Sequence, residues 1–172
     1  SMQGLPDTLA LIASVELEVA PVRRRLNDMS VGTIGRKPAW RGVLAGVPVV
    51  VVQSGMGKTN AAHAATALLE QGALAGVIGF GVGGAYPGSG LAIGDLALAT
   101  DEIYGDEGVD APQGWLSTRE MAIPLLRRSD TEYYNEFPLV PERVRAASAA
   151  LDGMQITHRS GAFVTVSNCS GT

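Results

Sequence analysis

Short apolar runs alternate with amphipathic stretches along the chain, a pattern typical of α/β proteins. Residues 9–15 (LALIASV) form one compact apolar run, and residues 16–27 place apolar side chains at helical spacing. Since proline is tolerated best in the first turn of a helix, Pro21 indicates that this helix begins near Leu17 or Glu18. Glu16 and Glu18 are therefore expected at the corner between a strand and a helix.

The alternation continues through the rest of the chain. Two β-rich runs, residues 40–44 and 47–53, flank Ala45-Gly46 and predict a hairpin that leads into a central strand. Residues 58–71 are rich in Ala and Leu and end at Gly72, which predicts a helix closed by a glycine. We further expect strands at residues 75–80, 94–100 and 161–166, the last one buried, a helix at 141–151, a polar loop at 101–109, and irregular exposed chain at 112–134.

Composition supports a single globular domain. The chain has 172 residues, of which 46% are apolar and only 17% charged, with 22 glycines. Low charge with many glycines suits a largely buried sheet packed tightly under helices. We therefore predict one α/β domain over residues 1–172, with a mixed, mostly parallel central sheet flanked by helices.

Charge and cysteine content exclude several classes of partner. The net charge is −4, and the basic residues form no block beyond the three arginines at 23–25, so a nucleic-acid-binding surface is not expected. Cys169 is the single cysteine, which excludes an intrachain disulfide and a multi-cysteine metal site. No apolar run approaches the roughly 18 residues of a membrane span, and no signal-peptide pattern is seen. We expect a cytoplasmic protein without membrane contact.

Residues 54–59 (SGMGKT) superficially match a phosphate-binding loop. That loop needs a glycine five residues before its Gly-Lys pair, and Val52 occupies this position inside a predicted strand. The loop is therefore too short to surround phosphates, and ATP or GTP hydrolysis is not predicted. It can still present backbone N–H groups and the start of a helix to a ligand.

A second glycine motif also fails as a nucleotide site. Gly79, Gly81 and Gly84 fit the dinucleotide fingerprint, but Pro87 and Gly88 follow at once and prevent the helix that should meet a pyrophosphate. A glycine-rich backbone at a strand end instead allows close approach to something flat or small. Tight packing between strand and loop is the alternative.

Three predicted strands end in features suited to ligand binding: a pair of glutamates, a glycine turn and a glycine cluster. An open α/β sheet binds its ligands beyond the carboxyl ends of its strands. Glu16 and Glu18 could equally form a solvated helix start, where acidic side chains favour the helix dipole. Both interpretations remain open on this pattern alone.

Four segments, in order, resemble the nucleoside phosphorylase superfamily, and specifically its branch of methylthioadenosine/adenosylhomocysteine nucleosidases and futalosine hydrolases. They are residues 14–21 (SVELEVAP), 54–62 (SGMGKTNAA), 79–110 (from GFGVGGAYPG to YGDEGVD) and 161–171 (GAFVTVSNCSG). Residues 84–87 and 104–109 resemble the futalosine branch. The resemblance implies cleavage of the N-glycosidic bond of futalosine with release of hypoxanthine, in menaquinone biosynthesis. A methylthioadenosine/adenosylhomocysteine nucleosidase, a purine nucleoside phosphorylase and a non-catalytic purine-binding fragment are the alternatives.

The resemblance also implies roles for individual residues. Glu18 matches the catalytic glutamate that helps to orient the attacking water. The implied substrate-binding positions are Met56 on the sugar side, Val82 and Gly83 near the nucleoside, and Phe163 with the Val164 backbone at the purine. No metal and no cofactor are implied. A homodimer is implied, with residues 101–109 near its interface.

Two departures from the family pattern bear on substrate and activity. Val82 stands where methylthioadenosine nucleosidases often have serine, which favours futalosine, and no arginine adjoins it to hold phosphate, which favours hydrolysis. The resemblance further implies a later segment, beyond Thr172, with a Glu that binds the ribose hydroxyls and an Asp that serves the leaving base. We therefore expect this chain, truncated before that segment, not to be a competent enzyme alone.

Overall fold

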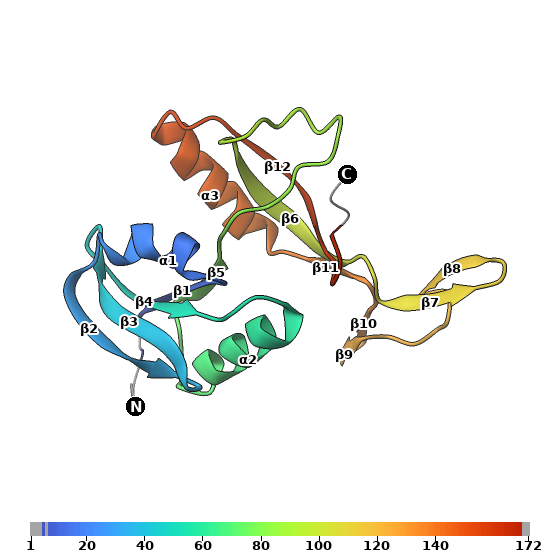
Figure 1. Cartoon of the computed structure of the whole chain (residues 1–172), viewed down its shortest axis with the longest axis horizontal. Coiled ribbons are helices and arrows are strands. Elements are labelled where there is room, and N and C mark those ends of the chain that lie inside the picture. Colours follow the sequence, from blue (N-terminus) through green and yellow to red (C-terminus); the bar gives the residue numbers. More distant parts are fainter. Residues whose placement is uncertain (1–4, 6, 170–172) are drawn as a thin grey trace. The chain divides into compact units, whose positions relative to one another are not determined.

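The computed structural model describes residues 5 and 7–169 (Figure 1). The chain divides into two compact units, Ser1–Gly84 and Ala85–Thr172. The predicted α/β fold with a mixed sheet is confirmed. The pairings of the five-stranded sheet are half parallel and half antiparallel, whereas mostly parallel pairing was expected. That the whole chain forms one domain stays a prediction.

The first unit is built around a five-stranded sheet with the strand order β2-β3-β4-β1-β5. Its elements are β1 (Leu9–Ala13), α1 (Glu16–Arg23), β2 (Asn27–Ile34), β3 (Lys37–Leu44), β4 (Val47–Gln53), α2 (Lys58–Leu69) and β5 (Gly76–Gly79). β1 pairs in parallel with both β4 and β5, whereas β2, β3 and β4 pair antiparallel. The carboxyl ends of β4, β1 and β5 therefore meet at one edge of the sheet.

The core of this unit lies on both faces of β4. Val50 and Val52 are fully buried in the cluster that contains Leu68 of α2. Val51, also fully buried, packs in a second cluster with Val19 of α1. Because successive side chains of a strand point to opposite faces, α1 and α2 cover opposite sides of the sheet, as Figure 1 shows.

The predicted hairpin is confirmed as β3 and β4. Its two turn residues, Ala45 and Gly46, have φ angles of 50° and 81°. Two successive left-handed residues are typical of the tight turn whose twist matches the flanking strands.

The predicted start of the first helix is wrong, because α1 begins at Glu16. The backbone N–H of Val15 donates to Oε2 of Glu18 over 3.2 Å, and the Glu18 N–H donates to the Val15 carbonyl over 3.0 Å. A carboxylate in the third helical position that reaches back in this way fixes the helix start. Pro21 consequently lies in the second turn and not in the first.

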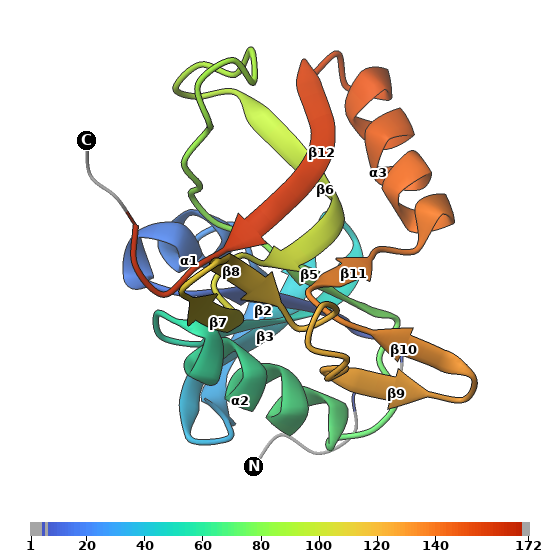
Figure 2. The same ribbon diagram turned by 90° about the vertical axis from the view of Figure 1, so that its right-hand side faces the viewer.

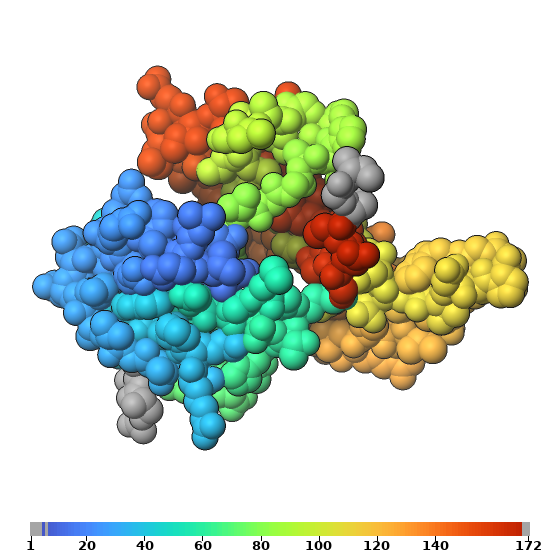
Figure 3. All heavy atoms as spheres, viewed as in Figure 1, coloured from blue at the N-terminus to red at the C-terminus, as the bar shows by residue number. Residues whose placement is uncertain are grey.

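The second unit contains one helix and seven strands among its described residues. They are β6 (Leu96–Tyr104), β7 (Gly108–Ala111), β8 (Gly114–Ser117), β9 (Leu126–Arg128), β10 (Thr131–Tyr133), β11 (Glu136–Pro138), α3 (Pro141–Gly153) and β12 (His158–Thr165). β6 lies between β11 and β12, and it is parallel to β12. Figure 2 shows α3 beside β6 and β12. The β7–β8 hairpin, yellow in Figure 3, projects from the other strands of this unit.

Three expectations for this unit are corrected. The predicted loop at 101–109 is strand as far as Tyr104, because β6 gains partners from both β11 and β12 there, and it is strand again from Gly108, where β7 begins. Residues 112–134, expected to be irregular, contain β8, β9 and β10. The last strand, β12, was expected to be buried, yet its side chains are exposed from Arg159 to Thr165.

No helix in the described part of the chain is long and apolar enough to span a membrane.

Candidate functional site

At the edge of the sheet where β4, β1 and β5 end, backbone hydrogen bonds connect the residues that follow β4 and β5 to the end of β1. The Ser54 N–H, just after β4, donates to the Ala13 carbonyl at the end of β1 over 2.9 Å. On the other side of β1, the Phe80 N–H donates to the Ile12 carbonyl, also over 2.9 Å. The turns that follow β4 and β5 are thus fixed relative to the corner between β1 and α1.

Glu18 connects this corner to the glycine turn after β5. Its Oε2 accepts the N–H groups of Ser14 at 2.9 Å and Val15 at 3.2 Å. Its Oε1 accepts the Val82 N–H at 2.9 Å. An ionised carboxylate only accepts hydrogen bonds and has about four lone-pair positions, so Glu18 keeps capacity for a further donor such as water.

The same contacts determine the charge of Glu18. Partial burial raises the pKa of its carboxyl, but the N–H groups of Val82, Ser14 and Val15 outweigh this effect, so the pKa lies below its ordinary value. Glu18 is therefore ionised at neutral pH. It is suited to hold a donor in place and to stabilise nearby positive charge.

The other predicted positions of this unit lie in the turns at the same edge. The Met56 side chain is 79% exposed, and its carbonyl accepts a hydrogen bond of 2.8 Å from Asn60 Nδ2. The Val82 side chain is 80% exposed, and the hydrogen bond to Glu18 comes from the Val82 backbone N–H. At Gly83 a β-carbon would meet nothing within 4 Å, which leaves open space beside the turn.

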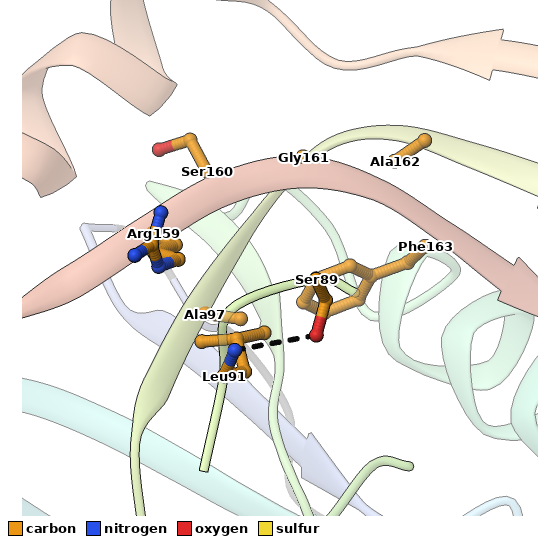
Figure 4. A pocket seen from close by; sticks show the side chains of 8 residues that line it. All are labelled: Ser89, Leu91, Ala97, Arg159, Ser160, Gly161, Ala162 and Phe163. Atoms are coloured by element: carbon orange, nitrogen blue, oxygen red, sulfur yellow. Dashed lines mark hydrogen bonds between the residues drawn. The ribbon is translucent and has the colours of Figure 1, made fainter. Parts of the chain in front are cut away.

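Phe163 and Val164 lie in the second unit, on β12, where they pair with Glu102 and Ile103 of β6. Phe163 is one wall of a pocket of about 450 Å³. The pocket is lined by Ser89, Leu91, Ala97, Arg159, Ser160, Gly161, Ala162 and Phe163. Figure 4 shows Arg159 and Phe163 on the same side of the β12 ribbon, as residues four apart in a strand must be. Their assignment to the purine stays a prediction.

Several groups at the candidate site and in the pocket were not expected from the sequence. The N–H groups of Ser14 and Val15 bind Glu18, yet a backbone donor leaves no trace in residue type. Arg159 lines the pocket beside Phe163. Strand periodicity could have indicated it, since the two residues share a face of β12.

A family model described as the phosphorylase superfamily matches residues 8–172, and the chain belongs to that superfamily. The match covers both units. It confirms the superfamily that the four sequence segments resemble.

Individual relatives include nucleosidases of two kinds. The chain is 36% identical over 103 residues to a 5'-methylthioadenosine/S-adenosylhomocysteine nucleosidase of Anoxybacillus flavithermus. This alignment covers 60% of this chain and 44% of the relative. It is 37% identical over 106 residues to a futalosine hydrolase of Thermus thermophilus, covering 60% of this chain and 43% of the relative. The chain thus matches about half the length of these curated relatives.

A solved structure agrees with the fold. The 5'-methylthioadenosine/S-adenosylhomocysteine nucleosidase of Neisseria meningitidis, in complex with methylthio-immucillin-A, superimposes with a TM-score of 0.74 at 27% identity. The superposition covers 92% of this chain and 64% of that one.

Proposed function

We propose that this protein is an N-glycosyl hydrolase acting on purine nucleosides, with Glu18 as the residue that orients the attacking water. The observation that carries the proposal is the Glu18 carboxylate, which is ionised and held by three backbone N–H groups where the parallel strands of the sheet end. Family membership supports the same class of reaction.

The chemistry of hydrolysis matches this carboxylate. As the bond between the ribose C1′ and the base nitrogen breaks, its electron pair leaves with the base and the sugar becomes oxocarbenium-like. Water then forms the new C1′–O bond and loses one proton. The departing base takes up one proton at its nitrogen, so the overall reaction is balanced. A fixed anion that accepts a hydrogen bond from the water orients its lone pair and stabilises the cationic sugar.

For the substrate we propose futalosine, with hypoxanthine as the released base, in menaquinone biosynthesis. Residues 84–87 and 104–109 resemble the futalosine hydrolases, and Val82 brings no hydroxyl to the turn. The Thermus thermophilus relative supports this choice. The nearly equal identity to a methylthioadenosine/adenosylhomocysteine nucleosidase makes that activity the second candidate.

We assign substrate contacts to Met56, Val82 and Gly83 in the first unit, and to Phe163 with the Val164 backbone in the second. The open space at Gly83 and the exposed Met56 side chain support contact with a ligand. An aromatic ring with nearby backbone polar groups suits a purine, because the ring stacks on the base while the polar groups bind its edge.

Base release measured by chromatography tests the proposal. Futalosine, methylthioadenosine and inosine are incubated with the protein, with and without phosphate, using this chain and a chain extended to the length of its relatives. From the extended chain we expect hypoxanthine from futalosine at a rate independent of phosphate. Dependence on phosphate would identify a phosphorylase, preferential adenine release would identify the second candidate, and purine binding without turnover in either chain would identify a binding protein.

A further inference from the structure

Gly81 lies directly against the carboxylate of Glu18. A β-carbon built at this position would lie 2.5 Å from Oε1 and 2.9 Å from Cδ of Glu18. Both distances are shorter than real β-carbon contacts allow. An alanine at position 81 therefore cannot coexist with the present position of Glu18.

The backbone itself does not require glycine at this position. Gly81 lies outside the left-handed region that favours glycine, in contrast to Gly55 and Gly57, whose φ angles are 85° and 98°. A side chain at position 81 is therefore excluded by its neighbour and not by backbone conformation.

Neither partner can move aside without breaking a contact. The Glu18 carboxylate is held on the other side by the N–H groups of Ser14 and Val15, so a shift away from position 81 must change its hydrogen bonds to Ser14, Val15 or Val82. The chain before Gly81 is fixed as well, because the Phe80 N–H donates to the Ile12 carbonyl. We therefore expect a methyl group at position 81 to separate Glu18 from the Val82 N–H.

We propose that Gly81 is a positioning residue for the hydrolytic site: its missing side chain makes the space in which the Glu18 carboxylate closes onto the Val82 N–H. This inference deepens the proposed function and rests on it for its catalytic meaning. The steric part concerns residues of this chain alone and is testable without turnover.

The chain offers a matched control two residues earlier. A β-carbon at Gly79 would meet nothing within 4 Å, and Gly79 also lies outside the left-handed region. Gly79→Ala therefore adds the same methyl group to the same segment without touching Glu18.

The first test follows the ionisation of Glu18 by NMR, with its carboxyl carbon labelled and assigned through the loss of its signal in Glu18→Gln. In the wild type and in Gly79→Ala we expect the Glu18 pKa below the ordinary range. In Gly81→Ala the Val82 contact is lost, so the pKa should rise toward that range, and the amide signal of Val82 should stop responding to the titration. An unchanged Glu18 titration in Gly81→Ala would overturn the proposal.

The second test is a double-mutant cycle on thermal unfolding. Gly81→Ala should lower the midpoint in the wild-type background and leave it nearly unchanged in Glu18→Ala, where the clashing carboxylate is absent. If Gly81→Ala does not fold alone, the double variant should fold. An equal loss in both backgrounds, or a double variant that also fails to fold, would contradict the proposal.

The two tests separate this inference from the proposed function. If both succeed and no base is released from any nucleoside, the positioning of Glu18 by Gly81 stands while the hydrolase proposal fails. If base is released but the Glu18 pKa is unchanged in Gly81→Ala, the hydrolase proposal stands and Gly81 has no positioning role.

Discussion

The carboxylate of Glu18 is bound almost entirely by the backbone. Ser14, Val15 and Val82 all donate through their N–H groups. The resemblance predicted Glu18 as a site residue, but it could not predict these donors, because any residue except proline supplies the same N–H. What the sequence does contain is the glycine at position 81, whose significance emerges only from the distance to Glu18.

The lowered pKa of Glu18 predicts a pH-dependent contribution to stability. An ordinary glutamate in an unfolded chain titrates at about 4.3. Since the pKa of Glu18 is lower in the folded protein, its contribution is fully present above that value and is lost as the pH falls through the folded-state pKa.

The isosteric variant Glu18→Gln measures this contribution. The difference in thermal midpoint between the wild type and Glu18→Gln should be constant near neutral pH and should shrink below about pH 4. A difference that stays constant or grows on acidification would contradict the assignment.

Among the elements, the pattern predicted the strongly apolar strands and the alanine-rich helices. β1, the β3–β4 hairpin, α2 and α3 were all found close to their predicted bounds. β2 was not predicted, because this edge strand leaves most of its side chains exposed and only Met29 and Val31 alternate with polar or small residues. β6 was predicted too short, since partners distant in sequence, β11 and β12, extend it through polar residues.

The misplaced start of α1 leads to a prediction about Pro21. A proline inside a helix removes a backbone hydrogen bond and crowds the preceding turn, at a cost of about 3 kcal/mol in a helix interior. Pro21 is exposed, so Pro21→Ala should raise the free energy of unfolding by about 1 to 3 kcal/mol in chemical denaturation.

Pro141 provides the matched control for that measurement. It occupies the first position of α3, where the missing N–H has no partner to lose. Pro141→Ala should therefore give no comparable gain. Equal effects of the two substitutions would show that position within the helix is not the cause.

Asn135 is expected to stabilise the base of the β7–β8 hairpin. Its Oδ1 accepts the N–H and the hydroxyl of Thr118, at 3.0 and 2.8 Å, and its Nδ2 donates to the carbonyls of Tyr104 and Glu107, at 2.9 and 2.7 Å. Thr118 is only 4% exposed, so Asn135→Ala leaves its polar groups buried without this acceptor.

The expected loss in Asn135→Ala is about 1 to 3 kcal/mol in the free energy of unfolding, with faster amide exchange in the hairpin. Asn135→Asp keeps the acceptor for Thr118 and should lose less. If Asn135→Ala unfolds like the wild type and exchange in the hairpin is unchanged, these hydrogen bonds do not fix the hairpin.

At the scale of the whole molecule, the superfamily resemblance predicts a homodimer. Light scattering on the purified protein should give twice the 17.8 kDa mass of one chain.

We place residues 101–109 near the interface, where Val109 is 46% exposed. Val109→Asp should therefore shift the population toward the monomer, because it introduces a charge into an apolar contact. A wild-type mass of one chain would refute the prediction.

The catalytic role of Glu18 is tested by comparing one pair of proteins. The measurement is kcat/KM for base release from futalosine by the wild type and by Glu18→Gln, with both chains extended to the length of the relatives. The uncharged amide cannot stabilise the cationic sugar or orient water as the carboxylate does, so we predict a decrease of about 10²- to 10⁴-fold with unchanged binding of hypoxanthine. A Glu18→Gln protein that cleaves futalosine at the wild-type rate would show that the Glu18 carboxylate is not catalytic.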